Sequence, residues 1–159
     1  MRLLLATLAL GVLAACGGSA DGQAELAVQA AESRLPATLE LGDVRISASL
    51  APTAALGPAT AARYGVAPDR GRQLLLVGIR QGPEHDETAL QARVGARARD
   101  LRGVWQDVAM REVRSDGFVD YVGTVRVAPP DTLALEVTVH RAGAEAPDVL
   151  RFSRDVFAP

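Results

Sequence analysis

The chain has 159 residues, of which 48% are hydrophobic and 23% are charged, and its formal net charge at pH 7 is −2. This mildly acidic balance gives no general case for nucleic-acid binding, because proteins that bind nucleic acids present a basic surface. All 17 basic residues are arginines, so the chain has no lysine for Schiff-base or nucleophilic amine chemistry.

The first 15 residues predict a secretory signal peptide. Arg2 gives a positively charged start, and an apolar run follows over Leu3–Leu13. A membrane-spanning helix needs about 20 apolar residues, so this run is too short to be one. The small residues Ala14 and Ala15 then precede Cys16, as they do at a signal-peptide cleavage site.

The tetrapeptide Leu13-Ala14-Ala15-Cys16 resembles the lipobox of bacterial lipoproteins. That resemblance implies cleavage before Cys16 and attachment of lipid chains to it, and two or more chains anchor a protein stably. Cys16 is the only cysteine in the chain. An ordinary signal peptide cut near Ala15 is the alternative. Because Gly17 follows the cysteine where an Asp would signal inner-membrane retention, the resemblance implies the periplasmic face of the outer membrane.

Two further segments complete the predicted domain organisation. Residues 16–37 contain the lipidated cysteine, a flexible tether and a short helix over residues 25–34. Pro36 ends this helix, because the residue before a proline avoids the helical region. Residues 38–159 are expected to form one domain, and a chain of this length buries a core without needing a disulfide.

From residue 39 onward the hydrophobic pattern indicates strands and short turns. Apolar and polar residues alternate from Val44 to Leu50, which predicts a half-buried strand that ends at Pro52. Residues 58–64 predict one or two helical turns, since a proline begins them and Gly65 follows. Residues 73–79 are apolar on both faces and predict a central strand.

The next segments alternate in the same way. A polar loop over residues 81–87 precedes a predicted strand over residues 90–98, and Gly103 separates that strand from residues 104–113. Ser115-Asp116-Gly117 then predicts a tight hairpin.

The partner strand of this hairpin and two later strands complete the pattern. The partner strand is expected to place on one face the side chains of Val119, Tyr121, Val125 and Val127. Residues 129–131 break it, and alternating strands follow over residues 133–139 and 150–156.

Seven or eight strands with frequent turn signals predict an all-β fold. We interpret the pattern as an immunoglobulin-like antiparallel β-sandwich with one short helix. A small closed β-barrel is the alternative.

Several short motifs between residues 40 and 158 resemble those of a known family. In chain order they are Gly42-Asp43, Tyr64-Gly65-Val66, Asp69-Arg70-Gly71-Arg72, Leu101-x-Gly103, Met110-Arg111-Glu112-Val113, Tyr121 and Thr132-Leu133. Their order is similar to that of a proteobacterial family of small exported proteins, catalogued as domain of unknown function four-four-two-six. That family usually has an aromatic residue where Met110 stands and a polar residue where Leu76 stands. The resemblance implies a compact β-sandwich in the cell envelope, and it implies no particular activity.

A row of arginines is the clearest predicted surface feature. Arg93, Arg97 and Arg99 fall on the polar face of one predicted strand, and Arg102 follows at its end. Residues two apart on a strand lie about 6.6–6.8 Å apart, so Arg97 and Arg99 are expected to be near neighbours. Guanidinium groups at this spacing suit phosphate head groups or another polyanion.

Ordinary cross-strand pairing with carboxylates such as Asp107 or Glu112 is the alternative use of these arginines. Arg111 and Glu112 are themselves adjacent in a predicted strand, so their side chains leave opposite faces and cannot pair with each other. We expect a structural role for this pair.

The remaining polar residues do not predict a catalytic or metal site. Residues 84–87 combine three carboxylates with one imidazole, but four adjacent residues of an extended loop cannot all converge on one ion. His140 is expected to be exposed on a strand. The sequence contains no nucleophile elbow, phosphate-binding loop or zinc-ligand spacing. We therefore expect no catalytic residues, no metal, no cofactor and no enzymatic activity.

These observations support two hypotheses on function. The first is a non-enzymatic interaction or assembly module at the outer membrane, whose partners are the membrane itself, envelope proteins or anionic head groups. The second is a carrier that holds a small apolar or anionic ligand between its sheets, which requires a pocket of roughly 300 Å³ or more.

Overall fold

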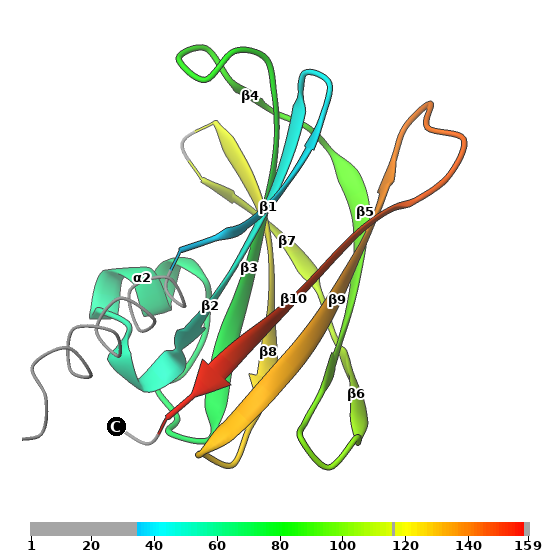
Figure 1. Ribbon diagram of the computed structural model, residues 1–159. Helices are drawn as coiled ribbons and strands as arrows, with labels where there is room; N and C mark the ends of the chain where they lie inside the picture. The colour runs from blue at the N-terminus through cyan, green and yellow to red at the C-terminus, as the bar shows by residue number, and fades with distance from the viewer. Residues whose placement is uncertain (1–34, 116, 158–159) are drawn as a thin grey trace, which may run out of the picture.

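Two antiparallel β-sheets packed face to face form the protein in this computed structural model, which describes residues 35–115 and 117–157 (Figure 1). The signal peptide, Cys16 and the helix predicted over residues 25–34 lie outside the described residues, as does Asp116. Among the described residues, none of the helices has the length and apolar character needed to cross a membrane.

The larger sheet has six strands. Its main path is, in spatial order, β1 (Ala37–Leu41), β2 (Val44–Pro52), β3 (Arg72–Gln81), β8 (Phe118–Arg126) and β7 (Arg111–Ser115), and β4 (Thr88–Ala89) pairs with β3. Between β2 and β3 the chain forms a 3-10 turn, η1 (Thr53–Ala55), and a short helix, α2 (Pro58–Arg63). The smaller sheet contains, in spatial order, β10 (Asp148–Val156), β9 (Asp131–Arg141), β5 (Ala92–Arg99) and β6 (Trp105–Val108).

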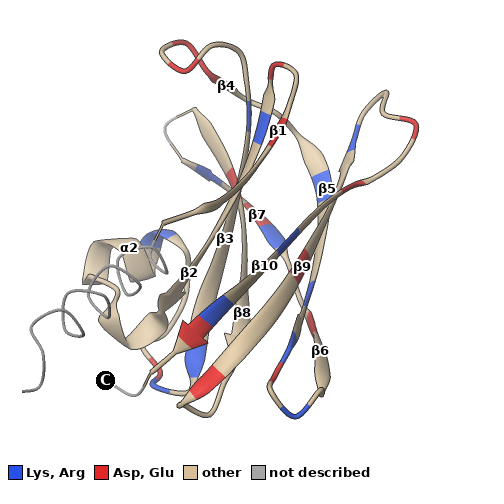
Figure 2. Ribbon diagram, in the orientation of Figure 1, with Lys and Arg blue, Asp and Glu red and all other residues tan. Residues whose placement is uncertain are grey.

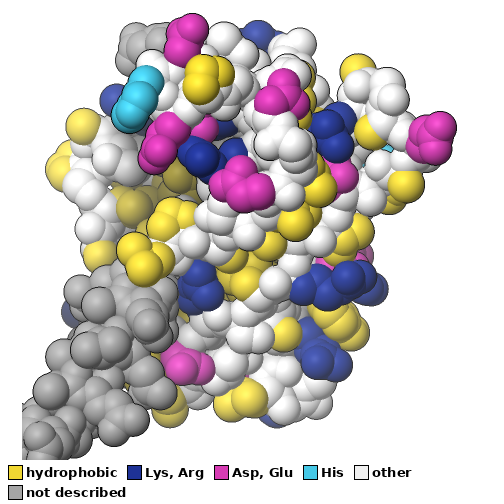
Figure 3. Space-filling model, turned by 45° about the horizontal axis from the view of Figure 1, so that its top comes forward, with side chains coloured by type: hydrophobic (Ala, Val, Ile, Leu, Met, Phe, Trp, Pro, Cys, Tyr) yellow, Lys and Arg dark blue, Asp and Glu magenta, His cyan; other side chains and the backbone are white. Residues whose placement is uncertain are grey.

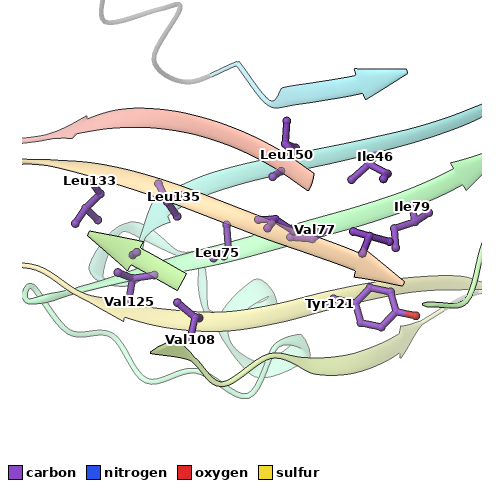
Figure 4. Close-up of a cluster of buried hydrophobic side chains, with 14 of the residues drawn as sticks. Ile46, Leu75, Val77, Ile79, Val108, Tyr121, Val125, Leu133, Leu135 and Leu150 are labelled. Atoms are coloured by element: carbon purple, nitrogen blue, oxygen red, sulfur yellow. The ribbon is translucent and has the colours of Figure 1, made fainter. Parts of the chain in front are cut away.

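Alternate residues of both sheets fill the space between them. Leu75 and Ile79 on β3 and Leu133 and Val137 on β9 have no exposed surface. Figure 4 shows such side chains from the two sheets meeting in a single cluster. Burial of this apolar surface is the main stabilising contribution to a fold that has no disulfide in its described part.

A smaller apolar cluster lies on the opposite face of the six-stranded sheet. Tyr64, which follows α2, packs there against Leu74 and Val122, and all three are buried. The segment from η1 to α2 therefore covers this face of β3. That explains why β3 is apolar on both faces, and it confirms the prediction of a central strand.

The predicted all-β, sandwich-type fold is confirmed, and the barrel alternative is wrong. The strands of the described chain form two separate ladders, so the sheet does not close on itself. The short helix that begins at Pro58 and the antiparallel pairing of Ser115 with Phe118 are also where the sequence predicts them.

The described chain has ten strands, against the seven or eight expected. A strand that was not expected, β1, precedes the one predicted from Val44, and residues 42 and 43 lie between the two. They form the turn between β1 and β2, because Leu41 pairs with Val44, and Gly42 adopts the positive φ of 65° that such a turn requires. The two-residue strand β4 was also not expected.

The third difference is that residues 104–113 form two strands in different sheets. β6 belongs to the four-stranded sheet and β7 to the six-stranded one, so the chain crosses between the layers at Ala109 and Met110. It passes directly over Gly123 of β8. A Cβ there would lie 2.6 Å from Val108 Cγ1 and 2.8 Å from Met110 Sδ, so the crossing depends on a residue without a side chain.

Candidate binding face on the four-stranded sheet

The predicted arginine row lies on the outer face of the four-stranded sheet. Arg93, Arg97 and Arg99 of β5 are all exposed, because this face of the strand points away from the core. Blue segments along β5, on β10 and at the β5–β6 turn mark these and neighbouring arginines in Figure 2. Their partners come from β6 and β9, which the sheet order places on either side of β5, and β10 lies beyond β9.

Glu136 of β9 stands between two arginines. Its Oε1 lies 2.8 Å from the Nη2 of Arg97 on one side, and its Oε2 lies 2.8 Å from the Nε of Arg151 on the other. These hydrogen bonds, the one from Arg151 first, hold the pKa of the Glu136 carboxyl below its ordinary value of 4.5. The carboxylate is therefore charged at neutral pH, and its hydrogen bonds hold both guanidinium groups beside β9.

Trp105 at the start of β6 lies against two of the same arginines. The guanidinium carbon of Arg97 is 4.3 Å from the ring centroid, and that of Arg99 is 5.2 Å away. Both distances are within the range of cation–π attraction. The ring itself is 45% exposed, so this large aromatic side chain belongs to the surface and not to the core.

A shallow groove of about 380 Å³ runs along the face beside Trp105. Its lining includes the small residues Ala134 and Ser153 between the larger Arg99, Trp105 and Arg151. Ala134 and Ser153 are register partners on β9 and β10, so the groove follows a row of small side chains across the sheet.

The face is locally positive although the chain is acidic. Arg97, Arg99 and Arg151 gather there against the carboxylates of Glu136 and of Asp107, which is the register partner of Arg97 on β6. Arg99 contacts an aromatic ring and forms no ion pair within the described residues. Its guanidinium donors are therefore free for a phosphate or carboxylate group of a partner.

Arg102 differs from the other members of the predicted row. It lies at the tip of the turn after β5, and its Nε and Nη2 donate to Asp100 Oδ2 at 3.0 and 2.8 Å. Arg93 lies at the other end of β5, paired in register with His140, and no ion pair joins it to another described residue. The structure thus brings Arg97 and Arg99 together on Trp105, whereas Arg102 borders a separate hollow with Arg99 at the turn and Arg93 lies at the other end of β5.

Arg111 and Glu112 point in different directions, and each has its own contacts. The Arg111 guanidinium donates to the carbonyl oxygen of Tyr64. Glu112 pairs with Arg114 at 2.6 Å and accepts a 3.4 Å hydrogen bond from the Tyr121 hydroxyl. Both residues are exposed.

Several of the family-like motifs meet around a hollow of about 430 Å³ on the six-stranded sheet. Residues of its rim already bind one another: Arg72 donates to Asp69 at 3.2 Å and to Thr124 at 3.4 Å, and Arg111 holds the Tyr64 carbonyl. These contacts fasten the segment between β2 and β3 onto the sheet, so we assign these residues a structural role.

The histidines and the acidic loop lie elsewhere. Residues 83–86 are exposed, and Glu87 pairs with Arg45 at 2.6 Å. His140 is exposed on β9, as its sequence position predicts. In the described part of the chain, no three His, Cys, Asp or Glu side chains are arranged to hold a metal ion.

Three residues of the face were not singled out from the sequence: Trp105, Glu136 and Arg151. The alternation around Trp105 is broken by the crossing between sheets, so its outward orientation could not be inferred. Glu136 and Arg151 join Arg97 through the β5–β9 and β9–β10 registers. Their outward positions were visible in the alternation, but the pairing that unites them was not.

The fold and this face define an antiparallel β-sandwich with a basic, aromatic outer surface. A comparison with protein families matches residues 38–159 to the family described as "Domain of unknown function (DUF4426)". The chain therefore belongs to the DUF4426 family, which confirms the resemblance seen in its motifs. Among curated proteins, none matches the chain significantly.

Solved structures show the same fold. A DUF4426 family protein from Pseudomonas aeruginosa PAO1 is similar with a TM-score of 0.66 and 18% identity, over 78% of this chain and 96% of that one. FetP from uropathogenic Escherichia coli strain F11 has a TM-score of 0.55 and 9% identity, over 78% and 96%. A copper-bound variant of FetP gives a TM-score of 0.54 and 9% identity, over 79% and 93%.

Proposed function

We propose that this chain is a non-enzymatic envelope lipoprotein, an interaction module that binds the phosphate head groups of an anionic membrane through the outer face of its four-stranded sheet. The observation that carries the proposal is the cluster of Arg97, Arg99 and Arg151 around the exposed Trp105. Guanidinium groups bind phosphate oxygens through paired donors, and aromatic rings of this kind favour the level of the head groups.

Envelope placement is supported by the sequence. The tetrapeptide ending at Cys16 resembles a lipobox, and acylation there would keep the domain beside a membrane surface. FetP, whose fold is similar, was expressed in the periplasm of Escherichia coli. A basic face on an acidic protein gives the tethered domain a preferred side to present to anionic lipids.

The carrier hypothesis receives less support from the geometry. The space that it assigns to a ligand is occupied by core side chains such as Ile46, Leu75 and Leu133. The hollows described above are open to the surface, and the one on the six-stranded sheet is bordered by arginines already bonded within the protein.

Co-sedimentation with vesicles tests the proposal. We expect the mature chain with Cys16→Ser, which cannot be acylated there, to bind phosphatidylglycerol vesicles in preference to phosphatidylcholine vesicles, and more weakly as salt rises. An arginine near an anionic surface contributes about 1 kcal/mol. The Arg97→Gln/Arg99→Gln variant should therefore bind roughly 10- to 30-fold more weakly.

The matched control is Arg63→Gln/Arg70→Gln, which removes the same charge from the segment covering the other sheet. It should bind as the parent does, apart from a small effect of net charge. Equal binding to both lipids at low salt, or equal losses in the two variants, would contradict the proposal.

A further inference from the structure

The turn between β5 and β6 carries an unusual concentration of exposed apolar side chains. Six large hydrophobic residues of the described chain are exposed: Leu35, Leu101, Val104, Trp105, Phe118 and Phe157. Leu101, Val104 and Trp105 lie within five consecutive residues, with exposures of 72%, 59% and 45%. Isolated exposed hydrophobics are common, but a group at one tip indicates a contact with an apolar partner.

A fourth exposed hydrophobic residue, Phe157, lies at the same end of the sandwich. The amide of Leu101 donates to Asp131 Oδ1 at 3.0 Å, and Asp131 is the register partner of Val156 at the end of β10. Phe157, 70% exposed, follows directly. Phe118 begins β8 and lies at the opposite end of the molecule (Figure 1).

Several backbone amides of the turn donate hydrogen bonds within the protein. Asp100 Oδ1 accepts the amide of Val104 at 2.8 Å, its Oδ2 binds Arg102, and its backbone carbonyl accepts the amide of Gly103 at 2.9 Å. The Val104 amide first, and then Arg102, hold the pKa of Asp100 below its ordinary value. Gly103 supplies the positive φ of 85° that closes the turn. Each amide bonded in this way costs less to bring toward an apolar medium than an unbonded one.

The basic residues lie where head groups would meet them. Arg99 directly precedes the turn, and the side chain of Arg102 at its tip is 80% exposed. Figure 3 turns the top of Figure 1, the end opposite to this turn, toward the viewer, and most of the acidic side chains that it shows lie in the upper half of the view. Apolar tips flanked by arginine and tryptophan match the layers of a bilayer surface, since chains, interface and phosphates follow one another within a few ångströms.

The segment between Cys16 and the domain is long enough to allow this contact. Residues 17–34 separate Cys16 from Leu35, and 18 residues span at most roughly 60 Å. An acyl anchor at Cys16 would thus hold the domain within reach of the bilayer that carries it.

We propose that the hairpin tip formed by Leu101, Val104 and Trp105 inserts into the surface of the lipid bilayer, with Leu101 and Val104 at the level of the upper acyl chains and Trp105 at the level of the head groups. This inference rests on the proposed function, and it adds to the charged face a second contact that does not depend on charge. The insertion orients the sandwich with its β5–β6 end toward the membrane and its β7–β8 hairpin away from it.

Trp105 is the only tryptophan of the chain, so its fluorescence reports this contact directly. The full-length protein, purified from membranes of expressing cells, is reconstituted into phosphatidylcholine vesicles with and without phosphatidylglycerol. Part of the lipid is brominated near the upper acyl chain. We expect brominated lipid to quench Trp105, and we expect the vesicles to reduce its quenching by aqueous iodide at least twofold.

The variant Leu101→Ser/Val104→Ser should lose at least half of the quenching by brominated lipid. Both side chains are exposed, so the variant should fold, which an unchanged far-UV circular dichroism spectrum checks. Phe118→Ser removes an exposed hydrophobic residue at the opposite end and should leave the quenching unchanged. Absence of lipid quenching in the parent, or equal quenching in parent and Leu101→Ser/Val104→Ser, would overturn the inference.

The outcomes separate the two proposals. Quenching that depends on Leu101 and Val104 in neutral vesicles, together with binding indifferent to Arg97 and Arg99, supports insertion and contradicts the charged face. Charge-dependent binding without quenching contradicts insertion and supports the charged face.

Discussion

At the scale of single residues, Tyr121 joins the two sheets. Its ring is buried in the core, and its hydroxyl accepts a 2.8 Å hydrogen bond from the amide of Ala92 on β5. The same hydroxyl donates to Glu112 on β7 at 3.4 Å. Burial raises the pKa of this hydroxyl, which therefore stays protonated and able to donate at neutral pH. One polar atom thus fixes the relative position of strands from both layers.

Tyr121→Phe should destabilise the protein by about 1–3 kcal/mol, because the Ala92 amide loses its partner in a partly buried position. Urea unfolding followed by circular dichroism measures the change, with an unaltered m-value as evidence that the native fold is retained. An unfolding midpoint equal to that of the parent would show that the hydrogen bond contributes little.

At the scale of elements, the crossing from β6 to β7 links the two sheets through one continuous segment. Gly123 of β8 lies beneath it, and its nearest neighbours would meet any added Cβ at 2.6–3.0 Å. Gly123→Ala should therefore displace the crossing and destabilise the fold by about 1–3 kcal/mol.

Gly95→Ala is the matched control for this prediction. It also adds one methyl group to a strand glycine, but a Cβ at Gly95 meets nothing within 4 Å. We expect it to be neutral or slightly stabilising, since alanine restricts the unfolded chain. Similar melting temperatures for the two variants would argue against a close crossing at Gly123.

Much of this architecture follows from local pattern. Alternation predicts β2, β5, β9 and β10, and apolar residues on both faces predict the central position of β3. What could not be predicted depends on long-range pairing. Residues 104–113 look like one segment because the sequence does not record which sheet each half joins. The strand β1 was not predicted, because it is short and follows a proline.

For the candidate site too, strand geometry predicts some features and the pairing between strands determines the others. The arginines of β5 were predicted to share a face because strand geometry alone places them there. Their carboxylate partner was not predicted: Arg97 binds Glu136, while Asp107 and Glu112 were the residues considered. The sequence alone does not contain the register between β5 and β9 that selects Glu136.

At the scale of the whole molecule, the two sheets and the two ends of the sandwich present different kinds of surface. The basic face and the apolar turn lie on the β5–β6 side, and the segment containing α2 covers the other sheet (Figure 1). If a lipid at Cys16 holds the domain beside a bilayer, this asymmetry gives the domain a defined orientation. The tip of the β7–β8 hairpin, where Phe118 pairs with Ser115, would then face away from the membrane.

Hydroxyl-radical footprinting of the full-length protein tests that orientation most directly. Trp105 and Phe118 are both exposed, at 45% and 55%, and both side chains react with hydroxyl radicals, so each serves as reference for the other. On anionic proteoliposomes, compared with detergent solution, we predict that oxidation of Trp105 falls at least threefold relative to oxidation of Phe118. An unchanged ratio, or selective protection of Phe118, would contradict a protein that meets the membrane through its basic face and hairpin tip.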